Sequence, residues 1–122
     1  MFHHVVAMQF NELADQAFFD KAEEYCERIR RTAKNLKCYV LRKNLAMRSD
    51  GLTHVILASF DTSADHDTYQ VSDVHVEMKA FMLPRIARIV VCDIDDIDDS
   101  DDSDDSDDSD DSDDSDDSDG AQ

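Results

Sequence analysis

The spacing of apolar residues changes along the chain, and the order of these changes restricts the fold. Residues 3–10 are rich in Val, Met and Phe and lack Gly and Pro, which indicates a strand. Residues 13–34 then carry apolar side chains every three or four positions, with acids early and bases late, which predicts an amphipathic helix. Two further apolar segments, 37–43 and 52–60, are joined by a loop that ends in Asp50-Gly51 and indicate a hairpin.

A second helix and a fourth strand complete this pattern. After a polar segment, 61–73, with room for one helical turn, Ser72 or Asp73 can cap a helix. Pro84 ends that helix because proline disfavours helical geometry in the residue before it, and residues 86–94 form the last strand. With right-handed crossovers and adjacent hairpins, the order β-α-β-β-α-β predicts an α+β, ferredoxin-like antiparallel sheet with both helices on one face.

The strands at 3–10 and 52–60 carry apolar side chains on both of their faces. Two helices can cover only one face of such a sheet, and a large bare apolar face is rare on a soluble monomer. A second copy of the same sheet is the simplest cover for the other face. The sequence therefore predicts a homodimer whose two sheets face one another as a dimeric α/β barrel.

The charge is divided unevenly between a nearly neutral block and an acidic tail. Residues 1–94 hold 12 Lys and Arg against 13 Asp and Glu, whereas residues 95–122 add 17 Asp and no base. The tail contains seven copies of Asp-Asp-Ser and almost no apolar residue, so it cannot bury surface to offset chain entropy. We therefore predict a domain at 1–94 and a disordered tail at 95–122. A neutral domain gives no reason to expect nucleic acid or a membrane as a partner.

Three roles for the acidic tail follow from its composition. A repeat of this kind keeps a protein soluble through its charge. Its serines, each followed by acids, are also suited to an acid-directed kinase, whose phosphates would add further charge. Dense carboxylates can in addition hold calcium weakly or attract basic proteins.

The cysteines and the N-terminal residues indicate a cytoplasmic protein. Cys26, Cys38 and Cys92 have no C-x-x-C spacing and are odd in number, which fits a reducing compartment. The first residues lack the basic and apolar regions of a signal peptide, and no stretch reaches the length of a membrane span. Adjacent His3 and His4 point to opposite faces of a strand, and no H-x-x-H spacing occurs, so we expect neither a metal nor another cofactor.

Several short motifs together resemble the stress-responsive A/B barrel (Dabb) domain family. These motifs are His4-Val-Val-Ala-Met-Gln-Phe10, Asn44-Leu45, the segment from Asp50-Gly51-Leu52-Thr53-His54-Val55 to Ser59-Phe60-Asp61, and Tyr69 followed by His75. The similarity covers nearly all of residues 2–94. It implies a ferredoxin-like protomer paired into a dimeric barrel, in a family whose best understood member is a plant polyketide cyclase that works without a cofactor.

The resemblance also implies roles for individual residues. Tyr69 and His75 match the acid/base pair of the cyclase, and His4 and His54 match histidines that line its pocket. The family commonly has His-Pro-x-His where this chain reads Ser72-Asp73-Val74-His75, so the start of the second helix differs.

Two hypotheses about function follow. The first is a stress-response barrel protein, a small homodimer whose apolar pocket holds a small apolar or aromatic carbonyl compound without established turnover. The alternative is a cofactor-free cyclase-like or lyase enzyme. In it His75 removes a proton next to a carbonyl and Tyr69 holds the oxygen that gains charge.

Overall fold

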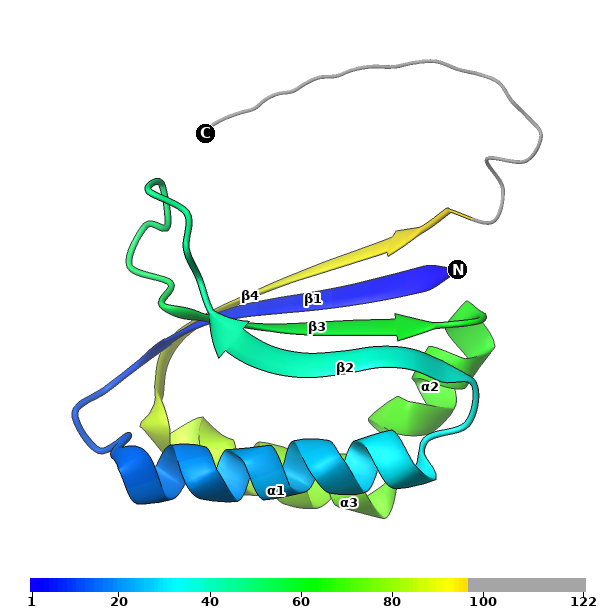
Figure 1. Cartoon of the computed structure of the whole chain (residues 1–122), viewed down its shortest axis with the longest axis horizontal. Helices are drawn as coiled ribbons and strands as arrows, with labels where there is room; N and C mark the ends of the chain where they lie inside the picture. Colours follow the sequence, from blue (N-terminus) through cyan, green and yellow to red (C-terminus); the bar gives the residue numbers. More distant parts are fainter. Residues whose placement is uncertain (97–122) are drawn as a thin grey trace.

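The computed structural model describes residues 1–96 of the 122-residue chain (Figure 1). Most of the segment predicted to be disordered, residues 97–122, lies outside the described part. The last strand continues to Asp95, one residue past the boundary predicted at 94. The elements are β1 (Phe2–Phe10), α1 (Gln16–Thr32), β2 (Leu36–Lys43), β3 (His54–Phe60), α2 (Ser63–Gln70), α3 (Asp73–Met82), a 3₁₀ turn (Leu83–Arg85) and β4 (Ile86–Asp95).

The strands form one antiparallel sheet in the order β2-β3-β1-β4, and α1 and α3 lie against the same face (Figure 1). This confirms the predicted ferredoxin-like α+β fold. The polar segment that was expected to hold one helical turn contains the eight-residue helix α2. Within residues 1–96, no helix combines the length and the apolar character that crossing a membrane requires.

Local capping explains where the helices and the hairpin begin and end. Asp15 caps α1 by accepting a hydrogen bond from the Phe18 amide, as expected of a short acidic side chain before a helix. The loop between β2 and β3 turns at Asp50 and Gly51, which have φ angles of 54° and 80°. Glycine tolerates such a positive angle, so this dipeptide makes the turn that the sequence predicted.

The hydrophobic core lies between the sheet and the two packed helices. Successive strand residues alternate between faces, and on β1 the residues that face the helices are His4, Val6 and Met8. The most deeply buried large side chains of the core come from strands and α1 alike. They are Tyr39, Phe60, Met8, Ile29 and Cys26.

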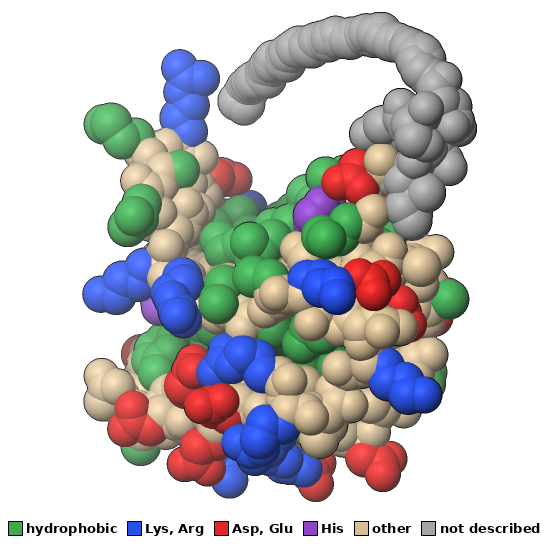
Figure 2. All heavy atoms as spheres, turned by 45° about the vertical axis from the view of Figure 1, so that its right-hand side comes forward, with side chains coloured by type: hydrophobic (Ala, Val, Ile, Leu, Met, Phe, Trp, Pro, Cys, Tyr) green, Lys and Arg blue, Asp and Glu red, His purple; other side chains and the backbone are tan. Residues whose placement is uncertain are grey.

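No helix of residues 1–96 lies over the other face of the sheet (Figure 1). Figure 2 shows hydrophobic side chains in the hollow between the projecting β2–β3 loop and the strands. By their strand register, Leu57, Val90 and Ile94 lie on this face, and they are 38%, 41% and 60% exposed. His3 is polar but is hydrogen bonded within this face, through Nδ1 to the Ser59 hydroxyl at 2.8 Å. Within the described part of the chain, this apolar sheet face is therefore left open.

Candidate functional site

A cavity of about 300 Å³ lies between the helix-covered face of the sheet and α3, beneath β4. Its walls are mainly apolar, and most of its polar side chains come from β1, α2, the start of α3 and β4. The apolar lining residues are Val6, Met8, Ile56, Met78, Met82, Leu83, Ile86, Ile89 and Val91. The polar and aromatic lining residues are His4, Tyr39, Tyr69, Gln70, His75, Lys79 and Asp93.

His75 lies at the start of α3 with its ring against that of Tyr69, at 4.5 Å between ring centroids. Its Nδ1 is 3.0 Å from the Gln70 carbonyl oxygen, which can only accept a hydrogen bond, so Nδ1 carries the proton. The Nε2 atom therefore keeps a free lone pair. Burial lowers the pKa of His75, against the smaller opposing effect of the Gln70 carbonyl. The imidazole is thus neutral near pH 7, the form that can accept a proton.

Tyr69 belongs to a buried pair of phenols. Its hydroxyl is 2.8 Å from that of Tyr39, which in turn lies 3.7 Å from the Met78 sulfur. Burial raises the pKa of both tyrosines, so both hydroxyls stay protonated at neutral pH. One of the two hydroxyl protons forms the hydrogen bond between Tyr39 and Tyr69. The other proton can be donated to the Met78 sulfur, which is a weak acceptor, or to an oxygen of a ligand.

Ser72 performs the capping role at the point where the sequence departs from the family pattern. Its hydroxyl donates to the Tyr69 carbonyl at 2.7 Å, and its Oγ accepts from the His75 amide at 3.3 Å. A single short side chain therefore connects the backbone of both predicted site residues. The missing His-Pro does not prevent Tyr69 and His75 from lying side by side.

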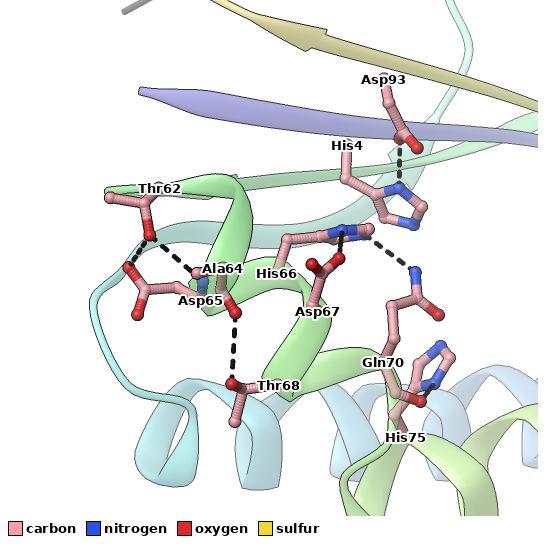
Figure 3. Close-up of polar contacts among 10 residues, drawn as sticks. All are labelled: His4, Thr62, Ala64, Asp65, His66, Asp67, Thr68, Gln70, His75 and Asp93. Atoms are coloured by element: carbon pink, nitrogen blue, oxygen red, sulfur yellow. Dashed lines mark hydrogen bonds and ion pairs between the residues drawn. The ribbon is translucent and has the colours of Figure 1, made fainter.

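Two residues that the sequence did not single out, His66 and Asp93, lie beside His4 (Figure 3). The His4 Nδ1 donates to an Asp93 carboxylate oxygen at 2.6 Å, and the His4 and His66 rings are 4.5 Å apart. The Gln70 amide lies 2.8 Å from His66 Nε2. Burial lowers the pKa of His66, and the charge of His4 lowers it further. The register of β1 with β4 sets Asp93 opposite His4, and no pattern along the sequence gives this register.

His54 does not lie in this cavity, so its predicted place in one pocket with His4 is corrected. The two histidines do share a face of the sheet. However, β1 and β3 are antiparallel, and His54 pairs with Met8 while His4 pairs with Ala58. His54 consequently lies at the opposite end, where its ring stacks on Phe19 at 4.7 Å.

This arrangement defines a class of protein, a small ferredoxin-like domain with a pocket between its sheet and its helices. The model of the stress-responsive A/B barrel domain matches residues 2–96. The chain therefore belongs to the stress-responsive A/B barrel domain family. No curated protein matches the sequence significantly.

Solved structures support the fold. The chain is similar to the Arabidopsis thaliana protein At3g17210, with 17% identity and a TM-score of 0.68 over 78% of this chain and 94% of that one. It is also similar to a hydroxynitrile lyase from Passiflora edulis, with 22% identity and a TM-score of 0.68 over 76% and 90%. A dimeric ferredoxin-like protein of unknown function from Thermobifida fusca gives 16% identity and a TM-score of 0.66 over 76% and 88%. At these identities, the similarity shows the fold alone.

Proposed function

We propose that this stress-responsive A/B barrel protein binds a small, largely apolar molecule that carries a carbonyl or hydroxyl oxygen. The observation that carries the proposal is the cavity, whose apolar walls end in a few convergent polar groups. Small-molecule sites have this composition, since apolar walls provide affinity and a few polar atoms fix orientation. A cavity of about 300 Å³ suits a compound of one ring or a short chain.

The polar end of the cavity specifies what the ligand offers. The tyrosine pair supplies one hydrogen-bond donor, and His75 Nε2 supplies one acceptor. A phenol with a carbonyl group can satisfy both at once, whereas a hydrocarbon satisfies neither. Aromatic ketones and phenols are therefore the first compounds to test.

Binding is tested by titrating simple hydroxyaryl ketones into the full chain and following amide shifts by NMR. We expect saturable shifts around the cavity, and a Val91→Phe substitution should weaken binding at least tenfold. Val91 lines the cavity but is half exposed, so a larger side chain can fill the space without overpacking the core. Val76→Phe is the matched control, because Val76 is equally exposed on α3 but lies outside the lining. Equal affinities for the two variants would contradict the proposal.

Acid-base turnover by His75 and Tyr69 is a second candidate. The single observation in its favour is the hydrogen bond to the Gln70 carbonyl, which leaves His75 Nε2 unprotonated inside the cavity. The high pKa of Tyr69 suits a hydrogen-bond donor and not a proton donor at neutral pH. Ligands that bind should therefore be incubated with the wild type and with His75→Ala, and the products followed by chromatography. Equal rates for the two proteins would exclude this chemistry.

The open face of the sheet favours a homodimer as the working form. Its exposed apolar residues need a cover, and the partner we propose is a second copy of the same face. The β2–β3 loop extends on this side of the sheet (Figure 1), and its residues Leu45 and Met47 are 90% and 101% exposed. The exposure of these apolar side chains is explained if the loop packs against the partner subunit in the dimer.

The dimer is tested by light scattering, which reports mass and is insensitive to the length of the tail. We expect twice the protomer mass at micromolar concentration and the protomer mass for Leu57→Asp, which places a charge in the open face. Val76→Asp, an equally simple change on an exposed helix position, should leave the mass unchanged. A monomeric wild type would contradict the proposal.

Location in the cytoplasm is part of the same proposal. All three cysteines are free in the structure, and Cys92 is exposed on β4. Free exposed thiols are compatible with a reducing compartment. A fluorescent fusion of the full chain would show the location directly.

A further inference from the structure

Three potential metal ligands converge beside the cavity from three separate elements. They are His4 of β1, His66 of α2 and Asp93 of β4, and one ligand atom from each lies within 4.8 Å of the others (Figure 3). Both histidines are buried, with 5% and 6% of their surface exposed. Two imidazoles and a carboxylate form a donor set that suits zinc and other divalent transition metals. No sequence motif indicates this group, because the three positions are far apart in the chain.

We propose that His4, His66 and Asp93 bind one divalent transition-metal ion and leave a coordination position open toward the cavity. Zinc sites with three protein ligands and an open position are the catalytic type, whereas structural sites have four. Because His4 and Asp93 also line the cavity, the open position faces the space where a small ligand would lie. The site does not depend on the proposed organic ligand, since the ion needs only the three side chains.

The required movement is small. In a tetrahedral site with bonds of 2.0–2.1 Å, ligand atoms are about 3.3 Å apart, so no pair has to close by more than about 1.5 Å. Asp93 lies on the exposed edge strand, where its side chain has room to rotate. The Gln70 amide, now hydrogen bonded to His66, is only partly buried and can turn away.

The protonation of the group also fits an ion. His4 and Asp93 now share a proton, and an ion takes the place of that proton. Binding of the ion therefore displaces the proton of this hydrogen bond.

The experiment is a Co²⁺ titration of the metal-stripped full chain, followed by visible absorption. We expect one equivalent per protomer with the strong d–d bands of a four- or five-coordinate site. The acidic tail can hold cobalt only through carboxylates and water, which give weak octahedral bands, and a Ca²⁺ titration reports that binding separately. Binding through the exposed Cys92 would show sulfur-to-metal charge transfer, which the proposal does not predict.

Variants locate the ion. Asp93→Asn and His66→Ala should each weaken Co²⁺ binding at least tenfold, and the d–d bands should be lost. Asp93→Asn changes an exposed position and is expected to fold. The test can therefore be decided with this variant alone if His66→Ala fails to fold. His54→Ala is the matched control, a histidine on the same sheet face outside the site, and should bind as the wild type does. Bands of equal strength in the wild type and Asp93→Asn, or no bands in the wild type, would overturn the proposal.

Discussion

The two ends of the helix-covered sheet face differ in what fills them. At the His54 end, the rings of Phe10, Phe18 and Phe19 pack with centroids 5.1–5.3 Å apart, and Phe81 stacks on Phe18. Edge and offset contacts of this kind fill space closely. We infer that this end is structural core.

At the His4 end, polar side chains hold one another and leave space. Each buried polar group there needs a hydrogen-bond partner, and the pairs His4 with Asp93 and Tyr39 with Tyr69 supply them. These hydrogen bonds fix the orientation of the side chains and keep them from turning into the cavity beside them. The comparison teaches that the same sheet face is packed for stability at one end and kept open at the other.

The largest expected effect tests the filled end. Phe18→Ala should lower the free energy of unfolding by about 3–5 kcal/mol, because it removes a buried ring and leaves a cavity among its neighbours. Chemical denaturation at one fixed protein concentration measures the change. Val76→Ala, at an exposed position, is the control and should change stability by less than about 0.5 kcal/mol. Similar losses in the two variants would mean that the aromatic end is not closely packed.

A smaller effect tests the open end. Tyr39→Phe and Tyr69→Phe should each lower the free energy of unfolding by about 0.5–1.5 kcal/mol, since each removes one side of a buried hydrogen bond. The double variant should cost less than the sum of the two, because the bond can be lost only once. Unfolding of the four proteins completes the cycle. Additive losses would show that the two hydroxyls act independently.

The fold could be predicted from local patterns, because periodicity, caps and Pro84 each act over a few residues. Tyr69 and His75 were also within reach, since both belong to one short segment that ends in the cap at Ser72. His54 lies on the predicted face of the sheet, the same face as His4, but at the opposite end of the strands, outside the cavity. The alternation of side chains gives the face, whereas the end of the sheet depends on strand direction and register.

The group of His4, His66 and Asp93 could not be predicted for a related reason. Asp93 reaches His4 only through the register of β1 with β4, and one residue of slip would turn it to the other face. His66 lies in α2, whose weak amphipathic pattern predicted no more than a single turn. Sites that form between distant segments depend on tertiary packing, which patterns along one segment do not contain.

The smallest expected effect is a pH dependence that again separates the two ends. Burial lowers the pKa of His66 and His75 at the open end and of His54 at the filled end, from the ordinary value near 6.5. The unfolded chain therefore binds these protons first as the pH falls. The stabilisation is fully present above pH 6.5 and is lost as the pH falls through the lower pKa values of the folded state. Denaturation between pH 7.5 and 5 should show a flatter slope for His66→Gln/His75→Gln than for His54→Gln, because two of the three shifted groups lie beside the cavity. A steeper loss of stability in the double variant would show that carboxylates, and not these histidines, control the acid response.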